Sequence, residues 1–255
     1  MNLFQSIILG VVEGFTEFLP VSSTAHLILV SKIIGLKSSD FLKTFEISIQ
    51  LGAIASVVFL YWKTLIHDWE LNKKILAALI PTALIGAIFY KLVKNVFLEN
   101  YLVSIYALLI GGVVIILFEM LHKEKESYVG ELRNISYKQA IVIGFFQSIS
   151  IIPGVSRAAA TIIGGLSMRI KREIIVEFSF LLAIPTMAAA TGLDLIQNVD
   201  SFSGADLINL GTGFIVSFIT ATLSISLLLK YIKDHDFTYF GIYRIAIALL
   251  FLFLL

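Results

Sequence analysis

The chain has 255 residues, of which 58% are hydrophobic and 15% are charged, and its formal net charge at pH 7 is +1. The near-neutral charge argues against a nucleic-acid partner, and the absence of cysteine excludes disulfides and thiolate chemistry. So much apolar surface would not suit a water-soluble domain of this length. The composition therefore predicts an integral membrane protein.

Several apolar runs approach or exceed the ~18 residues that indicate a transmembrane helix. The clearest of these runs are 45–62, 101–121, 174–193 and 207–229. Only helices and closed barrels span lipid, and these runs lack the polar–apolar alternation of barrel strands. We therefore expect an all-α, multi-pass membrane protein that contacts membrane lipids over its outer surface.

A polar segment, 13–26, interrupts the first apolar run of the chain. Glu13 and Glu17 are four residues apart, so they would share one face of a helix. Pro20 disfavours helix at the residue before it and would end this first arm. Ionised groups inside a membrane segment are costly, which makes these two carboxylates candidates for function.

The second arm of this segment begins with hydroxyl residues and a histidine. Ser22, Ser23 and Thr24 suit the N-cap of a returning helix, and His26 lies about one turn further on. A helix N-terminus with free N–H groups binds anions, so Ser22 and Thr24 are expected to contact the substrate. Two carboxylates close to an anion make chemical sense when a divalent cation bridges them, which predicts Glu13 and Glu17 as metal ligands.

A second polar segment follows the middle of the chain, at 147–161. Its Pro153-Gly154 pair would break the helix, and Ser156 would cap the next one. An arginine in that first turn would bind phosphate with two parallel hydrogen bonds. The expected substrate-binding residues of this segment are Gln147, Ser156, Arg157 and Thr161. Together, the two segments describe phosphoryl transfer on a substrate that is reachable from lipid, such as a lipid phosphate or diphosphate.

The two polar segments also resemble each other. Residues 10–16 align with 144–150, and 20–24 align with 153–157. We interpret the chain as a single membrane domain, 1–255, made of two inverted-topology repeats at about 1–122 and 136–255. Each repeat would be a re-entrant helical hairpin followed by three transmembrane helices. Clustered Lys and Arg would then face the cytoplasm, both termini would lie outside, and the hairpin tips would meet near the midplane.

The segment 13–26 resembles the first signature of the undecaprenyl-diphosphate phosphatase family, also called the bacitracin-resistance protein family, and 153–161 resembles the second. The resemblance implies a hydrolase of the bacterial inner membrane, with its active site open to the outer, periplasmic face. Its substrate would be a polyprenyl diphosphate lipid. Removal of the terminal phosphate of undecaprenyl diphosphate would recycle the carrier lipid for peptidoglycan synthesis, and overproduction would confer bacitracin resistance.

The resemblance also implies roles for individual residues. Activity would depend on a divalent cation, Mg²⁺ or Ca²⁺, with Glu13 and Glu17 in the metal and acid–base cluster. Either Ser23 or His26 would be the nucleophile, and Arg157 would hold phosphate. The chain departs from the family pattern at the second signature, where two alanines follow the arginine in place of Ser-Gly, so one hydroxyl is missing there.

Two alternatives to an enzyme remain open from the sequence alone. Inverted repeats with broken helices are typical of secondary transporters, so the chain could instead be a lipid-phosphate flippase or a transporter. A non-catalytic channel is a weaker alternative. Small residues such as Gly111-Gly112 would suit a helix face in a homodimer.

Overall fold

The computed structural model describes residues 1–37, 39–92, 101–198 and 204–254. Within these ranges the protein is helical, and its β-structure is limited to an isolated bridge between Val129 and Ile170. Four of the described helices are long and apolar enough to cross a membrane: α3 (Asp40–His67), α4 (Trp69–Leu92), α5 (Tyr101–Leu121) and α9 (Gly204–Tyr231). The predicted class, an all-α membrane protein, is confirmed.

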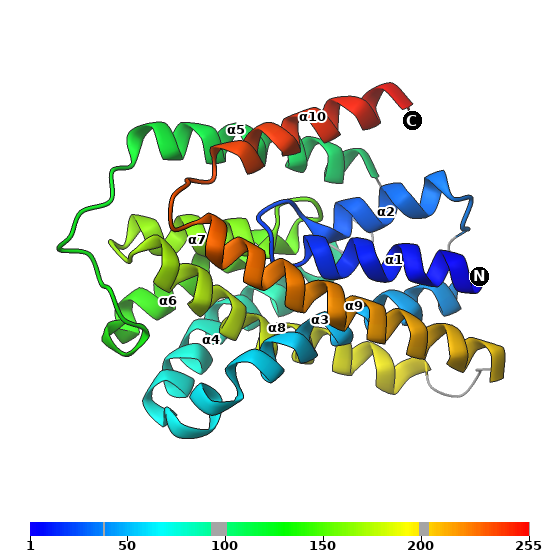
Figure 1. The fold of residues 1–255 in the computed structure, drawn as a ribbon, viewed down its shortest axis with the longest axis horizontal. Helices are drawn as coiled ribbons and strands as arrows, with labels where there is room; N and C mark the ends of the chain where they lie inside the picture. Colours follow the sequence, from blue (N-terminus) through cyan, green and yellow to red (C-terminus); the bar gives the residue numbers. More distant parts are fainter. Residues whose placement is uncertain (38, 93–100, 199–203, 255) are drawn as a thin grey trace.

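The remaining helices complete a regular order along the chain. They are α1 (Leu3–Thr16), α2 (Ser23–Ile33), α6 (Tyr137–Ser148), α7 (Arg157–Ser167), α8 (Arg172–Asn198) and α10 (Thr238–Leu254), with short 3₁₀ turns η2 (Leu132–Asn134) and η3 (Ile149–Ile151). A pair of short helices is followed by three longer ones, and this order occurs twice (Figure 1). The breaks between the short helices lie at the two polar segments of the sequence.

Large apolar side chains cover the outside of the helices. Trp69, Ile88, Leu121 and Phe253 are each more than 70% exposed. A water-soluble protein would bury such side chains, whereas a bilayer solvates them. The apolar exterior therefore agrees with a lipid environment.

Glycines allow the first arm of each hairpin to approach a longer helix closely. A Cβ atom at Gly14 of α1 would lie 2.0 Å from Thr220 Oγ1 of α9. In the second hairpin, a Cβ atom at Gly144 of α6 would lie 2.0 Å from the carbonyl oxygen of Ala78 in α4. Both hairpins are therefore packed into the interior of the molecule by the same device.

The Gly111-Gly112 face, which we expected to suit a homodimer, is already occupied by α10. A Cβ atom at Gly112 would lie 2.7 Å from the carbonyl oxygen of Gly241, and one at Gly111 would lie 2.2 Å from Arg244 Nη2. The small residues serve packing between α5 and α10 within one chain. This face is therefore not available to a second copy, and the possible homodimer stays a prediction.

Candidate active site

The two hairpins turn on serines with an unusual backbone conformation. Ser22 has φ 70° and immediately precedes α2, and Ser156 has φ 75° and immediately precedes α7. Positive φ is uncommon for residues other than glycine. Ser156 Oγ accepts a hydrogen bond from the Ala159 N–H at 3.2 Å, which confirms the predicted N-cap. The predicted capping by the Ser22 side chain is wrong, because it makes no such bond; its backbone leaves the helical region instead.

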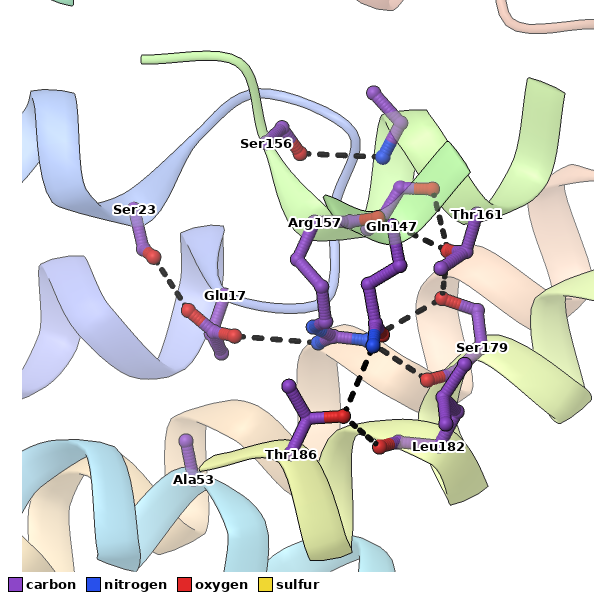
Figure 2. Close-up of polar contacts among 12 residues, drawn as sticks. Glu17, Ser23, Ala53, Gln147, Ser156, Arg157, Thr161, Ser179, Leu182 and Thr186 are labelled. Atoms are coloured by element: carbon purple, nitrogen blue, oxygen red, sulfur yellow. Dashed lines mark hydrogen bonds and ion pairs between the residues drawn. The ribbon is translucent and has the colours of Figure 1, made fainter. Parts of the chain in front are cut away.

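Glu17 connects the two polar segments, which are 140 residues apart in the sequence (Figure 2). Ser23 Oγ donates a short hydrogen bond to Glu17 Oε2. Arg157 Nη2 donates to Glu17 Oε1 at 3.2 Å, and both side chains of this ion pair are less than 10% exposed. The structure therefore brings three of the predicted catalytic residues into direct contact in the protein interior.

Other bonds hold the Arg157 guanidinium from the opposite side. Arg157 Nη1 donates to the Ser179 carbonyl oxygen at 2.7 Å and to Ser179 Oγ at 3.2 Å. Thr161 Oγ1 lies 2.6 Å from Ser179 Oγ and is fully buried. The guanidinium also lies 5.6 Å from the centre of the Phe18 ring. Thr161, for which substrate contact stays a prediction, is bonded to a residue that supports Arg157.

Gln147 lies beside this group and links the second hairpin to two neighbouring helices. Its Nε2 donates to Thr82 Oγ1 at 2.9 Å. The same atom donates to Thr186 Oγ1 at 3.1 Å (Figure 2). Its Oε1 is buried and has no hydrogen-bond partner within the described residues. The amide oxygen is thus the part of Gln147 that is left to interact with another molecule.

His26 is fixed through both ring nitrogens. Its Nδ1 lies 2.8 Å from the Ser22 carbonyl oxygen, and its Nε2 lies 2.9 Å from the Tyr243 hydroxyl. The two rings are stacked, with 5.6 Å between their centres and 3° between their planes. A carbonyl oxygen only accepts, so Nδ1 carries a proton, and the Nε2 of a neutral ring accepts from Tyr243. His26 is therefore bonded to Ser22 and Tyr243, and not to Ser23.

Glu13 is a buried carboxylate whose charge is not balanced by a direct hydrogen bond. Its side chain is fully buried, and neither carboxylate oxygen has a hydrogen-bond donor among the described residues. Its electrostatic neighbours are Glu17, Glu46 and Arg157. A buried carboxylate without a partner is costly, and carboxylate oxygens are the ligands that Mg²⁺ and Ca²⁺ prefer. The residues present therefore fit a divalent cation.

Within the described part of the chain, no group of three His, Cys, Asp or Glu side chains is close enough to hold a metal ion. Glu13 and Glu17 would thus supply only part of the coordination shell. Mg²⁺ in particular is commonly bound by one or two carboxylates, with substrate phosphates and water completing its shell. A two-carboxylate site is therefore suited to a phosphate substrate.

Three neighbours of the site were not predicted from the sequence. Tyr243 contacts His26, Ser179 contacts Arg157, and Arg244 is fully buried next to both hairpin turns. Arg244 carried a usable signal, because an ionisable residue inside an apolar membrane helix points to function. Thr24, in contrast, was predicted to bind substrate; it is partly exposed at the first turn of α2.

A cavity of about 440 Å³ lies beside the first hairpin, between α1 and the ends of α9 and α10. Its lining includes Phe15, Leu19, Leu227, Tyr231 and Phe240. It is mainly apolar, and none of the predicted site residues lines it. The polar site is therefore separate from this cavity.

Comparison with known proteins identifies the family. The model of the bacitracin resistance protein BacA family matches residues 6–250. The chain belongs to this family. It is 50% identical to an undecaprenyl-diphosphatase of Aquifex aeolicus, over 98% of each chain, and 49% identical to one of Wolinella succinogenes, over 100% of this chain and 99% of the other. An undecaprenyl-diphosphatase of Persephonella marina is also 49% identical, over 99% of this chain and 98% of its own. The BacA resemblance of the two polar segments is thereby confirmed.

Proposed function

We propose that this BacA-family chain hydrolyses undecaprenyl diphosphate to undecaprenyl phosphate and inorganic phosphate, and so recycles the carrier lipid for cell-wall synthesis. Full-length identity of about 50% to undecaprenyl-diphosphatases supports this activity. The observation that carries the catalytic assignment is the buried contact of Glu17 with both Ser23 and Arg157. The Glu17 carboxylate, the Ser23 hydroxyl and the Arg157 guanidinium are thus assembled at one point.

Ser23 is the nucleophile in this proposal, and Glu17 is its general base. Ser23 Oγ attacks the terminal phosphorus while its proton passes to Glu17 Oε2, which already accepts its hydrogen bond. The bond from that phosphorus to the bridging oxygen breaks, and the lipid monophosphate leaves. Water then attacks the phosphoserine, releases phosphate and restores the hydroxyl.

His26 is the rival nucleophile, and its contacts argue against that role. Its Nδ1 is bonded to the Ser22 carbonyl and its Nε2 to the Tyr243 hydroxyl, so attack on phosphorus would require the loss of a bond. We assign His26 to positioning of the first turn of α2. Phosphorylation of the wild-type enzyme at His26, located by mass spectrometry after trapping, would contradict this assignment.

Arg157 binds the phosphates in this proposal. Its guanidinium is permanently charged and suits two parallel bonds to phosphate oxygens. The N–H groups at the starts of α2 and α7, with Ser22, Thr24 and Ser156 around them, provide further donors near the anion. Thr161 holds Ser179 in place, and Gln147 holds two neighbouring helices through its amide nitrogen and leaves its amide oxygen for the substrate.

Glu13 and Glu17 would hold the divalent cation. Mg²⁺ or Ca²⁺ bound there supplies positive charge that offsets repulsion between the carboxylates and the phosphate oxygens. Glu13 lies next to Glu17, and none of the N–H or O–H groups of the described residues donates to its carboxylate, which supports this assignment. Replacement of Glu13 by Gln should weaken Mn²⁺ binding measured by electron paramagnetic resonance and should also lower phosphate release.

We further infer that the two halves are inverted repeats in the bacterial inner membrane. In Figure 1 both termini lie at one end of the molecule, with the loop between α5 and α6 at the other. The first hairpin enters from the end that holds the termini, and the second enters from the opposite end. The basic loops share that opposite end, which supports their cytoplasmic placement by the positive-inside rule. The site would then open to the outer, periplasmic face.

The transporter alternative is not favoured. The full-length relatives are named undecaprenyl-diphosphatases. The buried contact between Ser23 and Glu17 also suits a nucleophile better than an anion-conducting path. Transfer of a labelled lipid phosphate across proteoliposomes without release of phosphate would restore this alternative.

Phosphate release from a polyprenyl diphosphate by the purified protein, with Mg²⁺ or Ca²⁺, tests the proposal directly. We expect Ser23→Ala to lower kcat by at least about 10³-fold and Glu17→Gln by about 10²–10⁴-fold. Ser226→Ala is a matched control, because Ser226 is exposed on α9 and bonds only within its own helix. Wild-type activity in Ser23→Ala would refute the assignment of the nucleophile.

A further inference from the structure

Arg244 of α10 is fully buried and binds only backbone carbonyl oxygens. Its Nε donates to Leu108 at 3.3 Å, its Nη1 to Pro20 at 3.1 Å and Val155 at 3.0 Å, and its Nη2 to Ala107 at 3.1 Å and Gly154 at 2.8 Å. These five bonds match the five N–H donors of a guanidinium. The side chain is therefore saturated by main-chain acceptors.

The bonded carbonyls belong to both hairpin turns. Pro20 lies three residues before Ser23, and Val155 lies two residues before Arg157. One nitrogen, Nη1, binds these two carbonyls, so a single atom spans the gap between the turns. Moving Arg244 would thus change the separation of the nucleophile from the phosphate-binding arginine.

Helix α5 is shaped to admit this side chain. A Cβ atom at Gly111 would lie 2.2 Å from Arg244 Nη2 and 2.8 Å from its Cζ. Alanine at this position would therefore collide with the guanidinium. The small residue in α5 and the arginine in α10 form one unit, which we call the Arg244 clamp.

We infer that Arg244 is a positioning residue that fixes the spacing of the two hairpin turns, so that Glu17 can contact Ser23 and Arg157 together. This inference rests on the proposed function. It assigns Arg244 no contact with the substrate, because all five of its donors are engaged with the main chain. Lysine cannot replace it, since a compact ammonium with three donors cannot reach carbonyls on both turns and α5.

Steady-state kinetics of Arg244→Lys and Arg244→Gln form the first test. A displacement of about 1 Å between reacting groups can lower a rate by about 10²-fold, so we expect kcat to fall by about that factor. The KM should stay within about threefold, because the phosphate-binding groups remain present. Wild-type kcat in both variants, or a loss confined to KM, would overturn the inference.

Gly111→Ala provides a second test that leaves the arginine in place. The added methyl group should displace the guanidinium and lower kcat at least about tenfold. Gly211→Ala is the matched control, since a Cβ atom at Gly211 has no described neighbour within 4 Å. Equal kcat values for the two alanine variants would contradict the clamp.

A distance measurement separates the clamp from the catalytic proposal. The chain has no cysteine, so Ile33→Cys and Ser167→Cys would carry a specific pair of spin labels at the ends of α2 and α7. We expect a narrow label–label distance distribution in the otherwise wild-type protein and a broader or shifted one with Arg244→Lys. An unchanged distribution overturns the clamp, whether or not the protein releases phosphate. If the distribution changes with Arg244→Lys but the protein with wild-type Arg244 releases no phosphate, the clamp is supported and the proposed function is refuted.

Discussion

At the scale of single residues, the hydrogen bond between His26 and Tyr243 can be removed to test whether His26 positions α2 or takes part in the chemistry. If His26 only positions α2, Tyr243→Phe removes one hydrogen bond while keeping the stacked ring. A hydrogen bond contributes about 0.5–1.5 kcal/mol, so we expect phosphate release to fall by no more than about tenfold. Tyr239→Phe is the control, because Tyr239 lies exposed on the same helix.

The same assay distinguishes His26 from Ser23. We expect His26→Gln to retain measurable phosphate release, since the chemistry would be performed by Ser23 and Glu17. Loss of activity in His26→Gln as complete as that in Ser23→Ala would contradict a purely positioning role for the histidine.

The sequence predicted the convergence of Glu17, Ser23 and Arg157 because ionised and hydroxyl groups are rare and costly inside lipid. It could not predict that Thr161 would bond to Ser179, since side-chain partners depend on helix packing that no local pattern encodes. Arg244 could be recognised as an ionisable residue in an apolar helix, but its contacts could not be predicted. Its partners are main-chain carbonyls, and these leave no sequence signature.

At the scale of helices, the close approach of α1 to α9 depends on Gly14. Alanine there would meet Thr220 Oγ1 and the Ser217 carbonyl oxygen, and overpacking of this kind costs about 1–3 kcal/mol. We expect Gly14→Ala to lower the midpoint of thermal unfolding in detergent. Gly86→Ala should not lower it, because the nearest described atom would be 3.9 Å away. Equal unfolding midpoints for Gly14→Ala and Gly86→Ala would show that α1 and α9 can move apart without loss of stability.

The start of α4 provides a pH-dependent element outside the membrane spans. Asp68 accepts from the Leu71 N–H at 3.0 Å and from Arg133 Nε at 2.7 Å. The Leu71 N–H, followed by Arg133 and Lys74, holds the pKa of Asp68 below its ordinary value. The stability gained from this carboxylate is therefore present above its unfolded-state pKa of about 4 and is lost as pH falls through the lower folded-state pKa.

Two substitutions separate the charge of Asp68 from its capping role. Asp68→Asn keeps an N-cap acceptor, whereas Asp68→Ala loses it at a cost of about 1 kcal/mol. We expect wild type to be more stable than Asp68→Asn at neutral pH and the difference to shrink below about pH 4 in thermal unfolding measurements. A difference that stays constant with pH would contradict the charge contribution.

The helix pattern itself was accessible from the sequence. The named apolar runs identified α3, α5, α8 and α9 but did not include α4. Pro20 and Pro153-Gly154 marked the breaks in the hairpins. The main surprise was the Gly111-Gly112 face, because small residues suit contact within a chain as well as between chains. A sequence pattern does not state which of these two contacts is made.

At the scale of the whole molecule, membrane orientation can be tested with single cysteines. Lys37 lies near the amino-terminal end of the structure, where Gln5 Nε2 donates to the Ile34 carbonyl oxygen, and Lys233 follows α9 at the opposite end. In right-side-out membrane vesicles we expect a membrane-impermeant maleimide to label Lys37→Cys at once and Lys233→Cys only after permeabilisation. Both lysines are exposed, so accessibility within the protein is matched. The reverse labelling pattern would place the termini in the cytoplasm.

The left-handed serines, Ser22 and Ser156, have a consequence for the evolution of stability in this protein. Residues held in such sparsely populated conformations cost of order 1–3 kcal/mol each, and glycine would relieve much of that cost. Serine nevertheless occupies both turns, one residue ahead of Ser23 and of Arg157. A glycine at either turn would widen the range of conformations open to the loop before a lipid arrives. Selection for thermal stability alone would therefore be expected to favour glycine at these positions. Glycine would, however, make the site less preorganised for substrate binding.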